Sequence, residues 1–525
     1  MQNHSPSTLS IRLHKYEYWE KREVPSPNPS LLFGNISEVV RLKKTFGSIC
    51  HEIYKLYPND AIVGFYSLSA PALVVRDVNL IKELLIKEFY KFQDHVLTVN
   101  KNVDPILGAN LICLKGLEWK ESRTQLTPQF TLSKLKLIIP GLRKVGNDLL
   151  IYIQQQIDLN NSNCFGVQEL SRRFTSEAVF MSAFGLEGKS FTDTTPIAFQ
   201  IGEEIAGTGF ALRIKHLIGF LFPFLGKFFR TTFVGSPVTT RFKDIIVNTV
   251  STESLNIKIE VITSTIYQNY VIKIIQVMND SCLHQSNLLY SDQNTRERIH
   301  NCLPSHTNLL SLLPVKRSAS TTGHAFTYYL NGFETSAVAL NFLLYELALN
   351  QDIQEKCRKE IKTVLENDDR GDAVTSLKYI ENVIYETLRK HSPLTVLLRY
   401  CTSDCTLPQS LVNGRASSLT IEKNTMIAIP IESIHWDPLY YPNPEVFDPD
   451  RFTDASKLPF YGFGDGPRTC LGRNFAILQI KIFIATVLSE YKLTLNEKTV
   501  VPYEQEFLQI LNFPKEEIYV NFEKL

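Results

Sequence analysis

The segment from Pro459 to Phe483 reads PFYGFGDGPRTCLGRNFAILQIKIF, and it joins a glycine-rich loop to a long apolar helix. Glycines surround Cys470 in this loop, and glycine permits unusual backbone angles and the close approach of a flat ligand to the main chain. Cys470 lies at the predicted helix N-terminus with Arg468 two residues before it, and both features favour the thiolate over the thiol. The segment therefore predicts a loop shaped around a ligand, with a thiolate available as a soft metal ligand.

The surroundings of Cys470 narrow the choice of metal. No second cysteine or histidine lies at metal-ligand spacing nearby, so a tetrahedral zinc site is a poor fit. A metal that arrives with its other ligands attached fits better, and heme iron held axially by a cysteine meets that description. A glycine-rich turn that only precedes an amphipathic helix is the alternative.

Composition excludes several classes of protein. The chain has 525 residues, of which 44% are hydrophobic and 21% charged, so disordered, collagenous and disulfide-stapled proteins are poor fits. Lys and Arg number 55 against 54 Asp and Glu, which leaves no bulk positive charge to favour nucleic acid. The nine cysteines are odd in number and scattered, and they indicate thiols in a reducing compartment.

Apolar periodicity predicts a mostly helical chain with a minor strand-rich part between about residues 31 and 98. Strands and turns are also expected over 393–434. The predicted helices are Trp119–Ile139, Arg143–Ile157, Val167–Phe184, Phe199–Leu212, Ala325–Leu349, Gln351–Glu366, Ser376–Lys390 and Asn474–Glu490.

Three segments bear on domain organisation. Residues 1–30 contain no apolar run of the roughly 20 residues that a spanning helix needs, so no N-terminal transmembrane anchor is expected. Residues 251–322 are polar and without periodicity, and we expect an irregular stretch there. The apolar segment His216–Phe229 is either a buried helix pair or a patch that dips into a membrane face. We expect one domain over residues 1–525.

The cysteine loop resembles a known family. Phe463, Gly466, Arg468, Cys470 and Gly472 stand at the spacing FxxGxRxCxG, which is similar to the heme-binding loop of the cytochrome P-450 family. The resemblance implies the cytochrome P-450 fold, a large helical domain with a small N-terminal strand-rich region. It also implies heme b as cofactor, with Cys470 as the axial ligand of the iron.

A second match involves charged residues. Glu386 and Arg389 are three residues apart and share one face of a predicted helix, a spacing that is usually a solvated surface pair. Followed by FDPDRF (447–452) and the cysteine loop, the pair resembles the family's ExxR motif. The resemblance implies that Arg451 completes a buried structural charge network with them.

A third match lies in HAFTYYLNGFETSAVALNFLLYELALN, residues 324–350. Gly332, Glu334 and Thr335 resemble the family's oxygen-binding helix, where a glycine loosens the helical ladder and an acid-alcohol pair relays protons. The resemblance makes Glu334 and Thr335 the catalytic candidates, whereas an amphipathic helix with a surface Glu-Thr pair is the alternative. Asn331 departs from the small apolar residue usual in the family, and its amide could hydrogen-bond oxygen, hold a water or crowd the iron.

Heme carries two propionates, which need cationic or hydrogen-bonding partners. Trp119 and Arg123 resemble the family's WxxxR helix, and Arg468 is fixed beside Cys470. Arg399 and His435 are further candidates, with an ordinary strand-end arginine and turn histidine as the alternatives.

These features together predict a heme-thiolate monooxygenase, an oxidoreductase that inserts one oxygen atom of O2 into a lipophilic small molecule. Residues 423–451 look like the microsomal branch with insect detoxification enzymes, which implies insect hormone metabolism or detoxification of xenobiotics. Electrons would come from a separate NADPH-dependent flavoprotein reductase, because the chain has no flavin or nicotinamide fingerprint. The expected location is the cytoplasmic face of the endoplasmic reticulum (microsomal) membrane, held peripherally. A degenerate heme-binding protein without turnover and a heme-free helical scaffold are the alternatives.

Overall fold

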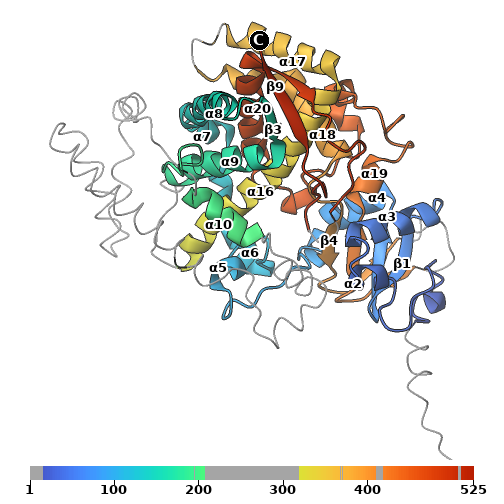
Figure 1. Ribbon diagram of the computed structural model, residues 1–525. Coiled ribbons are helices and arrows are strands. Elements are labelled where there is room, and N and C mark those ends of the chain that lie inside the picture. Colours follow the sequence, from blue (N-terminus) through green and yellow to red (C-terminus); the bar gives the residue numbers. More distant parts are fainter. Residues whose placement is uncertain are drawn as a thin grey trace, which may run out of the picture.

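The structure is a computed structural model that describes residues 16–193, 196–206, 240, 319–366, 368, 371–408, 418–506 and 510–525. Long helices gather on one side of the molecule, and a small sheet with short helices lies on the other (Figure 1). The predicted mostly α fold with a minor β part is confirmed. In the described residues no helix is both long enough and apolar enough to cross a membrane.

The helices vary from single turns to a rod of 31 residues. They are α2 (Ser37–Val40), α3 (Phe46–Leu56), α4 (Val78–Lys82), α5 (Pro105–Gly108), α6 (Gly116–Leu126), α7 (Leu132–Lys136), α8 (Ile139–Asn160), α9 (Val167–Val179), α10 (Ile197–Ala206), α16 (Ala319–Leu349), α17 (Gln351–Leu365), α18 (Lys378–Lys390), α19 (Ile431–His435) and α20 (Arg473–Glu490). Two π-helical turns, Glu83–Lys87 and Phe180–Phe184, continue α4 and α9.

Three small sheets accompany the helices in the described residues. The first has the order β1-β2-β7-β4, the second β3-β9-β8 and the third β5-β6. The strands are β1 (Ile62–Ser67), β2 (Ala70–Val75), β3 (Cys164–Gly166), β4 (Leu397–Tyr400), β5 (Cys405–Leu407), β6 (Leu419–Ile421), β7 (Met426–Ile429), β8 (Tyr491–Leu495) and β9 (Tyr519–Lys524).

The main core forms around α16, which contacts α5, α9, α18 and α20. α20 is buried on most of its circumference, because its sequence from Phe475 to Leu488 is apolar on every face. These two helices belong to the helical side in Figure 1, and α20 begins directly behind the cysteine loop. A helix buried in this way is a rigid support for the residues at its ends.

Several predicted boundaries were wrong. The single helix predicted over Trp119–Ile139 is instead α6, a 3₁₀ turn, α7 and the start of α8, because Pro128 lies in the turn and Thr131 is extended. α16 begins at Ala319, so residues 319–322 are helical rather than irregular. The strand-rich part expected near the N-terminus also includes two strands from late in the sequence. β7 pairs in parallel with β2, and β4 pairs antiparallel with β7.

Some predictions fall outside the described residues. These are the segment 1–15, the end of the helix predicted to reach Leu212, the apolar segment His216–Phe229, and residues 251–318 of the predicted irregular stretch.

Candidate active site

The cysteine loop is a short turn that presents Cys470 just before α20. The Cys470 amide donates to the Phe463 carbonyl at 2.8 Å, and the Gly464 amide donates to the Tyr461 carbonyl at 2.8 Å. Gly466 has φ +67°, and a Cβ built on it would lie 2.2 Å from the Leu85 carbonyl oxygen. Only glycine fits this position, so the family-like glycine has a physical cause in this chain.

The Cys470 side chain is solvent-accessible, yet protein atoms surround it closely enough that burial raises the pKa of the thiol. The amides of Gly472 and Arg473 and the charge of Arg123 oppose the rise without cancelling it. The protein alone therefore does not favour the thiolate expected from the sequence, because desolvation outweighs the effect of the helix N-terminus. The cations that favour the thiolate are Arg123 and Arg473, and not Arg468 as expected. A metal ion that displaces the thiol proton would shift this balance.

Arg468 and Trp119 pack together beside the loop. The Arg468 guanidinium carbon lies 4.2 Å from the centroid of the Trp119 ring. Its Nη1 and Nη2 donate to the carbonyls of Leu111 and Leu114 at 3.3 and 2.8 Å. Arg123 Nη1 donates to the Thr469 carbonyl at 2.9 Å, next to Cys470. The structure thus brings Trp119, Arg123, Arg468 and Cys470 together, as the sequence predicts.

A cluster of buried cations surrounds Arg468. Arg399 on β4 lies with Nη1 3.1 Å from His95 Nδ1. Burial lowers the pKa of Arg399 to about 10, and burial with the charge of Arg399 lowers that of Arg468 to about 9. Burial and the same two arginines hold the pKa of His95 well below its ordinary value. The carboxylate that faces this cluster is that of Asp94, 3.9 Å from Arg468 Nη2.

This cluster tests whether the site fits heme. In the described part of the chain, Arg399 Nη2 and Arg468 Nε are buried and have no hydrogen-bond partner. Buried donors on cationic side chains are costly unless an acceptor, preferably an anion, reaches them. Propionate carboxylates are such acceptors, and an accessible thiol is the right axial donor for iron. The residues therefore fit a heme group.

α16 passes over the start of α20 at Gly332. A Cβ on Gly332 would lie 3.2 Å from Val179 on α9 and 3.5 Å from Phe475 on α20, and the Gly332 carbonyl accepts from Gln479 Nε2 at 3.2 Å. The loosened ladder implied by the resemblance is not present, because α16 is continuous from Ala319 to Leu349. Gly332 instead permits close packing of three helices.

Glu334 and Thr335 point in different directions from α16. Glu334 is buried, and its Oε1 accepts from Arg172 Nη2 of α9 at 2.5 Å. Thr335 is partly exposed, and its hydroxyl donates to the Asn331 carbonyl at 2.7 Å. Consecutive helical residues are about 100° apart, so the two side chains leave α16 in different directions. The structure does not bring the Glu334 carboxylate beside the Thr335 hydroxyl.

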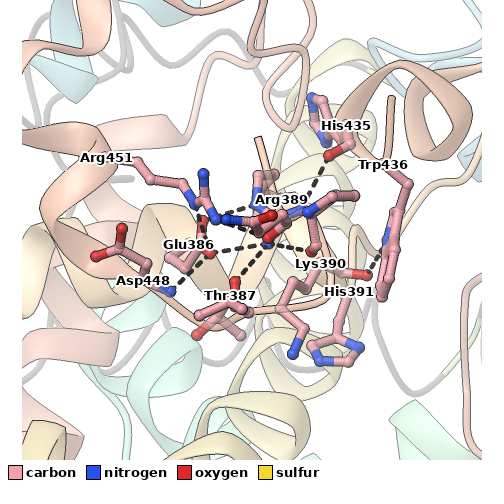
Figure 2. Close-up of polar contacts among 12 residues, drawn as sticks. Glu386, Thr387, Arg389, Lys390, His391, His435, Trp436, Asp448 and Arg451 are labelled. Atoms are coloured by element: carbon pink, nitrogen blue, oxygen red, sulfur yellow. Dashed lines mark hydrogen bonds and ion pairs between the residues drawn. The ribbon is translucent and has the colours of Figure 1, made fainter. Parts of the chain in front are cut away.

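The Glu386–Arg389 pair is fully buried (Figure 2). Arg389 binds the carboxylate with Nε and Nη2 at 2.7 and 2.8 Å, and it also donates to the carbonyls of His435, Pro444 and Val446. Arg451 Nε lies 3.5 Å from Glu386 Oε1. Burial raises the pKa of Glu386 above its ordinary value, and the contact with Arg389 opposes this rise without cancelling it. The structure therefore brings Glu386, Arg389 and Arg451 into one buried network.

His435 lies with this network rather than with the cation cluster. Its carbonyl accepts from Arg389, and its Nε2 accepts from the Tyr461 amide at 2.9 Å (Figure 2 shows the first contact). Burial lowers the pKa of the ring to about 3, so it is neutral. The contacts support a structural link between α19 and the cysteine loop. The ring Nδ1 is buried and has no hydrogen-bond partner in the described residues, and the heme contact predicted for His435 stays a prediction.

Comparison with known proteins gives the family directly. The model of the family described as cytochrome P-450 matches residues 24–522. The chain belongs to the cytochrome P-450 family. It is 30% identical over 529 residues to a probable cytochrome P-450 6a14 of Drosophila melanogaster, covering 98% of this chain and 97% of that protein. It is 29% identical over 503 residues to cytochrome P-450 6j1 of Blattella germanica, covering 93% and 89%.

Cytochromes P-450 bind heme b through a cysteine thiolate and are monooxygenases, so this chain is a heme-dependent monooxygenase, an oxidoreductase that uses O2. Members of the family act on lipophilic small molecules and receive electrons from a redox partner. The cofactor, enzyme class and family predicted from the sequence are confirmed.

Several residues of this cytochrome P-450 site were missed by sequence reasoning. Arg473 follows Cys470 by three residues and donates to the Tyr385 hydroxyl at 2.6 Å, and its position at the start of a helix could have drawn attention to it. His95, Asn110 and Arg172 carry no motif, because their places depend on which segments the fold brings together.

Proposed function

We propose that Cys470 is the axial ligand of heme b in this chain and that Arg399, Arg468, Arg123 and Trp119 bind its propionates. The observation that carries the proposal is the pair of buried guanidinium nitrogens, Arg399 Nη2 and Arg468 Nε, that lack an acceptor in the described residues beside an accessible thiol. Arg123 and Trp119 contact the same loop and the same arginine. Phe463 and Gly472 flank the cysteine and shape its surroundings, through a carbonyl and an amide respectively.

The bound heme would supply the activation of O2, and the protein's own groups would bind the substrate, exclude water and hold protons. Thr335 Oγ1 would hold a proton next to the accessible face of α16. Glu334 would supply a new proton to Thr335 after Thr335 has given its own proton away. To reach Thr335, the Glu334 carboxylate must turn away from Arg172. Glu386, Arg389 and Arg451 would keep α18 and the segment before the cysteine loop in register.

The substrate proposed is a lipophilic compound, in insect hormone metabolism or in detoxification of xenobiotics, with electrons from an NADPH-dependent flavoprotein reductase. The likeness to insect cytochromes P-450 supports this reading. The proposed location is the cytoplasmic face of the endoplasmic reticulum (microsomal) membrane, with peripheral contact through the apolar segment His216–Phe229. Replacing apolar residues of that segment by serine should reduce co-sedimentation with phospholipid vesicles.

The test is recombinant expression with heme quantitation and a reduced carbon monoxide difference spectrum. The protein should show the red-shifted Soret band of a thiolate-ligated ferrous complex. Cys470→Ala should abolish that band, while the control Cys164→Ala, at a partly exposed cysteine on β3, should leave it unchanged. A thiolate spectrum that survives Cys470→Ala would refute the ligand assignment.

A second candidate, a heme-binding protein with little or no turnover, is favoured by the amide of Asn331 on the exposed face of α16. Product analysis with lipophilic substrates and a supplied reductase separates the two. Oxidised product supports the monooxygenase, and Thr335→Ala should then lower product formed per electron consumed. A normal carbon monoxide spectrum with no product from any substrate would support the second candidate.

A further inference from the structure

A thiol, an amine and a carboxylate meet where β5 contacts the 3₁₀ turn Phe89–Lys91. Lys91 Nζ donates to Cys405 Sγ at 3.8 Å and to Glu88 Oε2 at 2.7 Å. The same carboxylate oxygen lies 4.0 Å from Cys405 Sγ. Lys91 and Cys405 are 314 residues apart in the sequence, so the fold brings these three reactive side chains together.

The Cys405 sulfur lies directly beneath the surface. Cys405 is 1% exposed, whereas the Lys91 and Glu88 side chains that contact its sulfur are 36% and 34% exposed. A small oxidant therefore reaches the sulfur when these two side chains move. The backbone around them is held in place, because the Thr402 amide donates to the Lys91 carbonyl at 2.7 Å. An amine fixed beside a sulfur in this way reacts with it far faster than a free amine would.

The neighbouring thiol of Cys401 is directed elsewhere. Its Sγ donates to the Ser403 carbonyl at 2.9 Å and to the Ile421 carbonyl at 3.6 Å. Lys91 Nζ, by contrast, is directed at the Cys405 sulfur. The Lys91 amine is therefore the group that meets Cys405 once its sulfur has been oxidised.

Glu88 supplies the base that such a reaction needs. Burial raises the pKa of the Cys405 thiol, and the charge of Lys91 opposes this rise. Both the thiol and the ammonium must lose a proton before they react, and Glu88 Oε2 contacts both of them. One carboxylate oxygen can therefore accept either proton and pass it to solvent.

We propose that Cys405 and Lys91 form a reversible modification site, in which hydrogen peroxide joins the two side chains through one oxygen atom as an N–O–S cross-link. An inserted oxygen spans more of the 3.8 Å between nitrogen and sulfur than a direct bond between them would. The cross-link would fix β5 to the turn Phe89–Lys91. The Phe89 ring lies 5.6 Å from that of Trp119, so this turn also supports the residues beside the cysteine loop.

The reaction balances with two molecules of hydrogen peroxide. The first oxidises the thiol to a sulfenic acid and releases water. The second displaces the sulfenic hydroxyl, which leaves as water, and places a hydroperoxyl group on the sulfur. The Lys91 nitrogen, deprotonated by Glu88, attacks the oxygen bonded to sulfur, the O–O bond breaks, and hydroxide leaves with the N–H proton as a third water. Sulfur and nitrogen each lose two electrons, and each peroxide accepts two.

The experiment treats the full-length, heme-loaded protein with hydrogen peroxide and analyses non-reduced digests by mass spectrometry. Wild type should yield two peptides joined through Lys91 and Cys405, with the mass of one added oxygen less two hydrogens. Dithiothreitol should separate them. Before reduction the urea midpoint should be higher than that of untreated protein, because a cross-link over this length of chain restricts the unfolded state.

Matched variants identify the groups. Lys91→Arg keeps the positive charge but lacks the amine, and Cys405→Ser lacks the sulfur, so each should abolish the cross-link. Glu88→Gln should slow its formation several-fold, because the ammonium and the thiol lose their shared proton acceptor. The control Cys401→Ser removes the neighbouring thiol and should leave the cross-link unchanged.

A disulfide between Cys401 and Cys405 would overturn the proposal, as would a sulfinic acid on Cys405 beside an unmodified Lys91. A cross-link that survives Lys91→Arg, or one without the added oxygen, would overturn it as well. All of these outcomes are read from peptide masses, so they are separate from the carbon monoxide spectrum that tests the proposed function.

Discussion

Replacing Glu386 by Gln tests whether the buried network is held by charge compensation. The change keeps the shape of the side chain and removes the negative charge that Arg389 binds with two nitrogens. Both side chains are 0% exposed, so no water can replace the carboxylate. Three carbonyls would remain on Arg389, and the Asp448 amide, which donates to Glu386 Oε1 at 2.9 Å, would compete for the single amide oxygen.

An uncompensated buried charge costs about 3–5 kcal/mol. The matched control is Glu355→Gln on α17, because Glu355 and Arg358 have the same three-residue spacing and a 2.5 Å contact, but Glu355 is 49% exposed. Exposed pairs of this kind contribute about 0–1 kcal/mol. The difference between the two variants therefore isolates burial from sequence spacing.

The assay is urea unfolding followed by tryptophan fluorescence, with the transition midpoint of each variant compared with wild type at one temperature. Glu386→Gln should lower the midpoint strongly and Glu355→Gln barely. The double variant Glu386→Gln with Arg389→Met should be more stable than Glu386→Gln alone, because the unpaired cation is gone. Equal midpoints for the two single variants, or a double variant less stable than Glu386→Gln, would refute the reasoning.

Three further changes probe the loop, the buried histidine and the cation cluster. Gly466→Ala should lower the yield of heme-loaded protein several-fold, because its Cβ would lie 2.2 Å from the Leu85 oxygen, and an unchanged yield would contradict this. His435 has a folded pKa of about 3 against an ordinary 6.5, so it contributes stability above pH 6.5 that is lost as the pH falls toward 3, by at most about 5 kcal/mol. In His435→Gln, urea midpoints should vary less between pH 6.5 and 4, and an unchanged slope would contradict this. Arg399→Met should release hemin to apomyoglobin about tenfold faster, since a buried cation is removed, and equal release rates would argue against a propionate contact.

The sequence predicted the cysteine loop well because its constraints are local. The positive φ of Gly466 and the start of α20 behind Cys470 are properties of adjacent residues. The buried network was harder to predict. Glu386–Arg389 and Glu355–Arg358 have identical spacing, and only the packing of α18 against the 449–457 turn distinguishes a buried pair from a surface one.

Predictions that depend on distant segments were less complete. His435 is the clearest case, because a turn histidine before an Asp-Pro pair gives no sign of which arginine it meets, and it meets Arg389. Arg172 could not be linked to Glu334 from sequence, since their contact needs α9 and α16 to cross at that point. The thiolate ligand predicted from the sequence is confirmed for the family, but the desolvation that raises the pKa of the Cys470 thiol in the chain without heme depends on distant segments and could not be predicted from the sequence.

The pairing of β2 with β7 constrains how the polypeptide is made. Ala72 lies opposite Met426, so the β1–β2 hairpin leaves the ribosome long before the strand that covers its edge exists. Until β7 has been synthesised, the unpaired edge of β2 can form hydrogen bonds with strands of other chains. Synthesis of this protein should therefore depend on chaperones that shield the early hairpin, and slowing translation between the two strands should increase aggregation of the nascent product.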